Sequence, residues 1–342
     1  MTSARQPVSG PDVWLGTDYA HNQEWVYHFS DAAIADIDRA MRSVRQRDRL
    51  LDDITAEDFD LPALAQDLNQ MGRILSSGRG FVLLKGLDID KYSSEEFAII
   101  FWGIGTHLGV GVSQSHLGDR IGHVKDIGGK GRYYTAGGPI EVHMDPADVT
   151  GLLCLREAKH GGESWIMSSM MIRNILLEER PDLLEVLYRG YHYGGPGTGP
   201  GGNRTAHRLP VYAEKAGACY SFYLPAAIVG RGSGSTEELS DAEREAMALL
   251  DEIAVRPQVR LEMDLRPGDI QFLNNRKLFH ARGDYEDHPD PAKKRHLLRL
   301  WLMMPHWPPL PESMKFLNKA DRAGGGVPKG DESVTELVGS AG

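Results

Sequence analysis

The feature that most constrains the fold is a series of short strand-like segments, each bounded by turn residues, that begins after residue 80. The first is Gly80–Gly86, an apolar run between two glycines, which predicts a buried strand. Further strands are predicted at 120–126, 139–144, 150–156, 163–168, 218–223, 259–265, 269–274 and 296–304. So many separate strands favour a sandwich or barrel over a parallel doubly wound sheet.

Amphipathic helices precede and interrupt these strands. Apolar residues spaced three and four apart predict helices at 32–45 and 61–77. Ser93-Ser94-Glu95-Glu96 opens a third predicted helix at 94–107, and further helices fit 169–188 (interrupted by Pro181) and 240–254. This order indicates an α+β plan. We see neither an internal repeat nor a linker, so we predict one domain over 1–342. Its parts are an N-terminal arm and helices (1–79, with 1–29 irregular), a strand-rich core with inserts (80–305) and a tail (306–342).

Charge and hydropathy exclude several classes of protein. The net charge is −10 and no long basic run occurs, so we expect no nucleic-acid partner. No stretch approaches ~18 consecutive apolar residues, so we expect no membrane span. The first ten residues are polar, which argues against a signal peptide, and the two cysteines are interpreted as buried thiols. We therefore expect a cytoplasmic protein; homo-oligomerisation is left open.

A His-x-Asp pair, His143 and Asp145, is the strongest candidate for a metal site. His143 and Asp145 end a predicted strand, where side chains two residues apart point to the same face, so both can bind one metal. A third ligand must come from elsewhere, and His280 is the best candidate. Two histidines and one carboxylate on one face of an octahedral metal leave three positions open, which is the geometry of non-heme Fe(II) oxygenases.

Two arginines follow on the last predicted strand. Alternation would put Arg295 and Arg299 on one face together with Leu297 and Trp301. Arginine suits the distal carboxylate of 2-oxoglutarate because its planar fork binds a carboxylate through two hydrogen bonds. The alternative is an edge strand with ordinary exposed arginines.

The order of these parts resembles the taurine dioxygenase-like (TauD/TfdA) family of Fe(II)/2-oxoglutarate-dependent oxygenases. The resemblance covers roughly residues 80–305 and implies a double-stranded β-helix (jelly-roll) core with flanking helices and long loop insertions. The motifs that carry it are His143-x-Asp145, Gly161-Gly162-Glu163-Ser164, Gly268-Asp269-Ile270, Asn274-Asn275-Arg276, His280-Ala281-Arg282 and Arg295-x-x-x-Arg299.

The resemblance also implies roles for individual residues. The two histidines and the aspartate named above would bind iron, while Ser164 and Arg295 would hold 2-oxoglutarate. Arg299 would face the same site and contact 2-oxoglutarate or an anionic substrate. The segment 281–294 is longer than in the tightest family version, so the division of roles between the two arginines stays open. Arg282 is interpreted as a turn or salt-bridge residue.

The reaction implied uses Fe(II), 2-oxoglutarate and O2, releases succinate and CO2, and oxidises a C–H bond of a small molecule, most simply by hydroxylation. The retained Asp145 favours hydroxylation or desaturation over halogenation, since related halogenases replace the carboxylate. Two other classes are weighed against this reading. One is a non-redox jelly-roll metalloenzyme (hydrolase or isomerase) that uses the same site, and the other is a non-catalytic binding protein on this fold.

Two glycine-rich segments are expected to reach the mouth of the barrel. The chain contains 39 glycines, of which six fall within 194–202, so we expect no regular element in the segment 191–208. This segment is interpreted as an active-site lid, and the alternative is a surface insertion. The segment 132–138 precedes the iron motif. Cations on these segments would suit a carboxylate-bearing molecule such as an amino acid. The candidate substrate contacts are Tyr133, Tyr134, Arg204 and Arg208.

Overall fold

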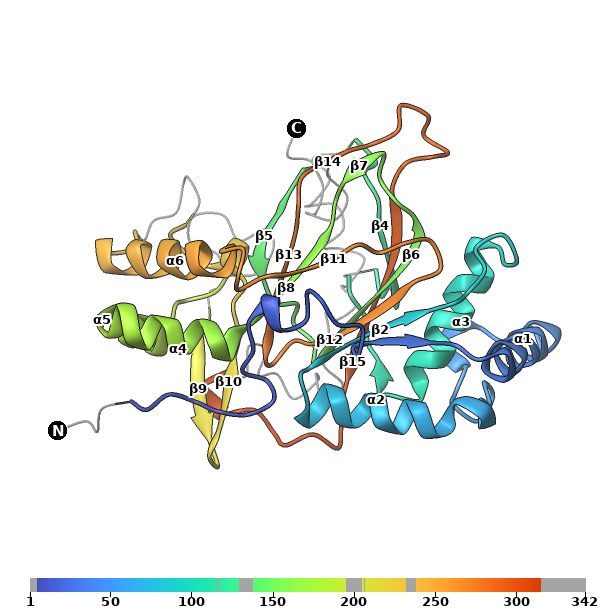
Figure 1. Ribbon diagram of the computed structural model, residues 1–342, viewed down its shortest axis with the longest axis horizontal. Helices are drawn as coiled ribbons and strands as arrows, with labels where there is room; N and C mark the ends of the chain where they lie inside the picture. The colour runs from blue at the N-terminus through green and yellow to red at the C-terminus, as the bar shows by residue number, and fades with distance from the viewer. Residues whose placement is uncertain are drawn as a thin grey trace.

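Two β-sheets face each other at the centre of the protein (Figure 1). The computed structural model describes residues 5–115, 117–128, 138–194, 205, 207–231 and 238–314. The larger sheet has the order β1-β2-β12-β6-β15-β3, with β4 also paired to β15, and the smaller sheet has the order β11-β8-β13-β5. Two further strand pairs, β9–β10 and β7–β14, lie outside these sheets.

The elements agree closely with the predicted pattern. The strands are β1 (Val26–His28), β2 (Phe81–Lys85), β3 (Val110–Gly111), β4 (Ile121–Val124), β5 (Ile140–His143), β6 (Val149–Arg156), β7 (His160–Gly161), β8 (Ser164–Ser168), β9 (Tyr212–Lys215), β10 (Ala218–Ser221), β11 (Leu261–Met263), β12 (Ile270–Asn274), β13 (Leu278–Arg282), β14 (Tyr285–Glu286) and β15 (His296–Met303). The helices are α1 (Asp31–Gln46), α2 (Ala65–Ser77), α3 (Ser94–Thr106), α4 (Ser169–Glu179), α5 (Pro181–Arg189) and α6 (Asp241–Ala254).

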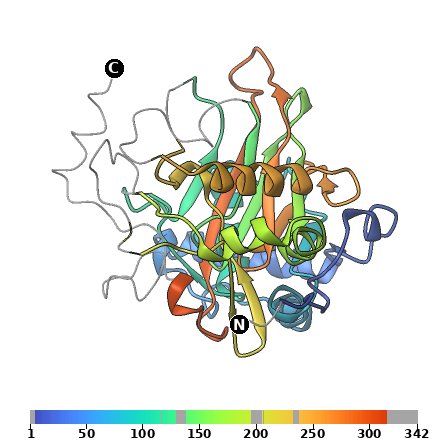
Figure 2. The ribbon, with the colours of Figure 1, turned by 90° about the vertical axis from the view of Figure 1, so that its left-hand side faces the viewer.

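The helices cover the outer faces of the two sheets (Figures 1 and 2). Helices α1–α3 pack on the larger sheet and α4–α6 on the smaller one. Local signals set the helix ends: the capping boxes of Ser93 with Glu96 and of Ser240 with Glu243 begin α3 and α6. Pro181 divides the predicted helix 169–188 into α4 and α5, because proline is tolerated only in the first turn of a helix.

Six strands of the described residues were absent from the prediction, namely β1, β3, β7, β9, β13 and β14, and two of them, β1 and β13, lie at positions that matter. The segment 1–29 was expected to be irregular, but it contains β1, which pairs in parallel with β2. Strand β13 was also missed. Its residues Leu278, His280 and Arg282 alternate with Phe279 and Ala281. Leu278, His280 and Arg282 face inward, and because two of these three are polar, the apolar alternation by which a strand is recognised is broken.

The space between the sheets is where the site is built. Apolar side chains from both sheets meet there, among them Leu83 and Leu297 from the larger sheet and Ile166 and Leu278 from the smaller. The described part of the chain contains no helix long and apolar enough to cross a bilayer.

Candidate active site

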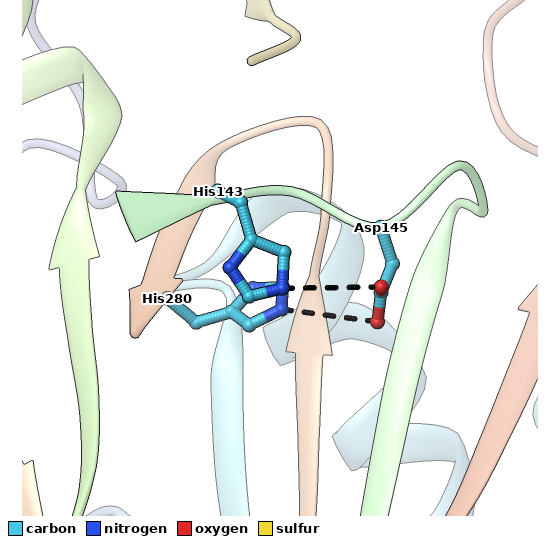
Figure 3. Close-up of side chains that lie close together, drawn as sticks. All are labelled: His143, Asp145 and His280. Carbon is cyan, nitrogen blue, oxygen red and sulfur yellow. Dashed lines mark ion pairs between the residues drawn. The ribbon is translucent and has the colours of Figure 1, made fainter. Parts of the chain in front are cut away.

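Two histidines face each other across neighbouring strands of the smaller sheet (Figure 3). β5 ends at His143, which pairs directly with His280 on β13, and the ring centroids are 4.2 Å apart. His143 Nδ1 lies 2.8 Å from the carbonyl oxygen of Glu141. A carbonyl can only accept, so Nδ1 carries the proton and Nε2 keeps its lone pair for a metal.

Asp145 completes a three-residue cluster. It was predicted to share the strand of His143, but β5 ends at His143 and the Met144 amide instead donates to the carbonyl of Tyr223 (2.7 Å). Asp145 Oδ1 lies 4.0 Å from His143 Nε2, and Oδ2 lies 3.8 Å from His280 Nε2. One ligand atom from each residue falls within 4.8 Å of the others, so the three side chains converge although they do not share a strand.

Three neighbouring side chains hold the Asp145 carboxylate in place. Trp301 Nε1 and Thr150 Oγ1 each donate to Oδ2 at 2.9 Å, and Arg299 Nη1 lies 3.2 Å from Oδ1. Burial by itself would raise the pKa of Asp145, but the charge of Arg299, followed by the two histidines and the Trp301 hydrogen bond, holds this pKa at about 2. The sequence did not identify Thr150, whose contact depends on the tertiary structure.

The protonation states suit a divalent metal. Burial lowers the pKa of His143, and burial followed by the charge of His143 lowers the pKa of His280 to about 3. Neutral imidazoles and an ionised carboxylate are the forms that bind a metal ion. His280 Nε2 faces the Asp145 carboxylate at 3.8 Å, and Nδ1 is buried with no hydrogen-bond partner among the described residues. This donor set of two nitrogens and one carboxylate fits Fe(II).

Arg299 lies at the metal centre in a fixed position. Its Nε donates to Gln114 Oε1 (2.8 Å), and Gln114 Nε2 donates back to the Arg299 carbonyl (2.7 Å). Gly122 allows this approach, because a Cβ there would lie 2.8 Å from Gln114 Oε1. The side chain lies between the sheets beside Asp145 rather than on an exposed edge.

Ser164 and Arg295 form part of a second buried group. Ser164 begins β8, and its Oγ donates to Gln271 Oε1 (3.2 Å). Arg295 directly precedes β15, and its Nη2 donates to the Gly162 carbonyl (3.2 Å). Burial, followed by the nearby charge of Arg282, lowers the pKa of Arg295 to about 10.

The predicted alternation from Arg295 to Trp301 is interrupted. β15 begins at His296, and its register against β6 shifts between His296 and Leu297. Arg295 and Arg299 are therefore separated by a strand irregularity, and they contact different groups: Arg295 contacts Gly162, whereas Arg299 contacts Asp145.

Of the four candidate substrate contacts, the structure describes one, Arg208. Tyr133, Tyr134 and Arg204 lie outside the described residues. Arg208 is described, and its Nε donates to the carbonyl of Gly190 (2.8 Å) while the guanidinium pairs with Glu243 in the first turn of α6. These contacts join the residue after α5 to the first turn of α6.

Two facing sheets with a cluster of two histidines and one carboxylate between them define the class of protein, a non-heme iron oxygenase with a jelly-roll core. Comparison with known proteins gives the family. The sequence model of the "Taurine catabolism dioxygenase TauD, TfdA family" matches residues 46–301. The chain belongs to this family and is an Fe(II)- and 2-oxoglutarate-dependent oxygenase that uses O2 as co-substrate.

Individual relatives agree with this assignment. FR-33289 synthase of Streptomyces rubellomurinus is 30% identical over 320 residues, which cover 91% of this chain and 94% of that protein. A structure of asparagine oxygenase with Fe(II), 3-hydroxyasparagine and succinate has a TM-score of 0.66 at 16% identity, and covers 82% of this chain and 94% of the other. The oxygenase OrfP with Fe, succinate and (3S)-hydroxy-L-Arg has a TM-score of 0.59 at 15% identity, with the same coverage. At these identities the two solved structures show the fold alone.

Proposed function

We propose that this oxygenase hydroxylates a carbon of a small, carboxylate-bearing, amino-acid-like molecule. The observation that carries the proposal is the fixed guanidinium of Arg299, which lies between the sheets beside the iron ligand Asp145. A cation at this point favours a substrate whose anionic group lies next to the reacting carbon. The hydroxylated amino acids named in the solved structures of asparagine oxygenase and OrfP support the same substrate class.

Each residue has a proposed role. His143, Asp145 and His280 hold iron. Ser164 and Arg295 bind the distal carboxylate of 2-oxoglutarate, and Arg299 orients the substrate. We also propose that Tyr133, Tyr134 and Arg204 contact the substrate. Arg208 has no part in this proposal because Glu243 and Gly190 engage its guanidinium.

The protein prepares the site for the cofactors. When bound, iron and 2-oxoglutarate supply the oxidation, in which 2-oxoglutarate is converted to succinate and CO2. Trp301 and Thr150 donate hydrogen bonds that fix one orientation of the Asp145 carboxylate, so it stays ionised and directed at the two histidines. Asp145 and His280 are buried and His143 is half-buried, which limits the access of bulk water to the reacting atoms.

The first test concerns the iron centre. Anaerobic addition of Fe(II) and 2-oxoglutarate should give a visible metal-to-ligand charge-transfer band. The His280→Ala variant should give no band, whereas the matched variant His28→Ala, which removes an exposed histidine of β1, should retain it. Absence of the band in the unmodified protein would contradict the assignment.

The second test concerns the substrate and leaves the protein unchanged. Amino acids and small acids are screened for substrate-dependent succinate release, and each hit is compared with its primary amide and methyl ester. We expect the free carboxylate to be required. Equal rates for acid and amide would refute the role of Arg299 in binding an anionic group.

A further inference from the structure

A second buried arginine, Arg282, lies in the space between the sheets. It ends β13, and only 6% of its surface is exposed. One of its guanidinium nitrogens, Nη2, donates to the carbonyl of Gly138, just before the iron-binding strand β5. The sequence suggested a turn or salt-bridge residue at this position, but a turn residue would lie at the surface.

The strand geometry aligns Arg282 with both the metal site and Ser164. Arg282 follows His280 by two residues, so the two side chains share a face and their Cα atoms lie about 6.7 Å apart along β13. On the neighbouring strand β8, Ser164 is the direct partner of Arg282. A keto acid that chelates iron beside His280 and extends along β13 would therefore reach Arg282 and Ser164 with its far end.

Arg295 lies close to the same point. The two guanidinium carbons are 4.8 Å (Arg282) and 5.5 Å (Arg295) from the centroid of the Tyr285 ring. Gly162 makes room for Arg295, since a Cβ at Gly162 would lie 3.1 Å from its Nε. Among the described residues, no carboxylate forms an ion pair with Arg295, and the charge of Arg282 adds to burial in lowering its pKa. The carboxylates of Asp126 and Asp284 act on Arg282 and that of Asp287 acts on Arg295, which offsets part of the repulsion. An anion bound between the two guanidinium groups would offset more of it.

We propose that Arg282 and Arg295 together bind the distal carboxylate of 2-oxoglutarate, so that Arg282 is a second determinant of selectivity for a keto diacid. This inference rests on the proposed use of Ser164 and Arg295 in 2-oxoglutarate binding. It assigns to one strand, β13, both an iron ligand and a co-substrate ligand. The two-residue spacing of His280 and Arg282 along β13 then sets the distance between the iron ligand and the group that binds the distal carboxylate.

The experiment compares two keto acids that differ only at the far end. In 2-oxopentanoate, a methyl group replaces the distal carboxylate of 2-oxoglutarate. Anaerobic charge-transfer titrations give the dissociation constant of each keto acid for the Fe(II)-loaded protein and for the variants Arg282→Met, Arg282→Lys and Arg295→Met. The matched control is Arg266→Met, which removes an arginine paired with Glu157 at the surface.

We expect Arg282→Met to weaken 2-oxoglutarate binding on the order of 10- to 100-fold, which is typical of a lost charge-assisted hydrogen bond. Binding of 2-oxopentanoate should be unchanged, and Arg282→Lys should recover part of the loss. Equal weakening of both keto acids would show a merely structural role and overturn the proposal, as would unchanged 2-oxoglutarate binding. If the unmodified protein gives no band with either keto acid, the iron and 2-oxoglutarate assignment itself fails, which is a separate result.

Discussion

Replacing Trp301 with phenylalanine should weaken metal binding while preserving the fold. The substitution keeps a ring in the buried position but removes the indole N–H that donates to Asp145 Oδ2 at 2.9 Å. A hydrogen bond to a charged group contributes about 1.5–3 kcal/mol. Each 1.4 kcal/mol corresponds to about a tenfold change in a binding constant, so we expect metal affinity to fall by roughly 10- to 100-fold.

Urea unfolding with and without Mn(II) measures this loss as stability. At a metal concentration 100 times the dissociation constant, binding stabilises the native protein by about 2.7 kcal/mol. If affinity falls 100-fold, the same concentration gives only about 0.4 kcal/mol. The metal-dependent gain in unfolding free energy should therefore drop by about 1–2 kcal/mol in Trp301→Phe.

The matched control is Trp102→Phe. Trp102 is also buried, and its indole N–H donates to the carbonyl of Ile54 at 3.0 Å in the core under the larger sheet. Both variants should lose some stability without metal, but only Trp301→Phe should lose the metal-dependent gain. If both variants gain the same stability from Mn(II), the idea that Trp301 tunes the metal ligand is refuted.

Further outcomes follow from the same structure. Burial, followed by neighbouring positive charges, lowers the pKa of His296 to about 4. The unfolded chain therefore binds a proton at this residue more readily than the folded protein does. As a result, the free energy of unfolding should decline as pH falls from 6.5 to about 4. Urea unfolding across this range should show a slope that His296→Gln reduces by up to about 1.4 kcal/mol per pH unit. Gly162→Ala should weaken 2-oxoglutarate binding, because the added Cβ would displace Arg295. The control Gly217→Ala, at a similar positive φ (+79° against +80°) with nothing within 4 Å, should leave this binding unchanged. Equal dissociation constants of the two variants for 2-oxoglutarate would contradict the prediction. Arg208→Ala should lower the unfolding free energy by about 0.5–1 kcal/mol and leave KM unchanged, and a raised KM would return Arg208 to the substrate site.

Local sequence signals determined most of the secondary structure. Helix ends depend on groups a few residues apart, such as Ser93 with Glu96 and Ser240 with Glu243, so the sequence contains the information needed to place them. The short apolar strands between turn residues were predictable for the same reason. The His-x-Asp motif likewise predicted two of the three side chains that cluster in the structure, because their spacing is local.

Strand β13 and the contacts around the metal needed the tertiary structure. The inward positions of β13 after Leu278 are His280 and Arg282, whose polar character is tolerated only because both sheets bury them against partners distant in the chain. Trp301 and Thr150 meet at Asp145 although they are 151 positions apart, and nothing local in the sequence links them. Local patterns thus determined which elements form and which residue types could bind a metal. Long-range strand pairing decided which polar groups meet in the interior, because the energy of a buried charge depends on neighbours that only the folded chain provides.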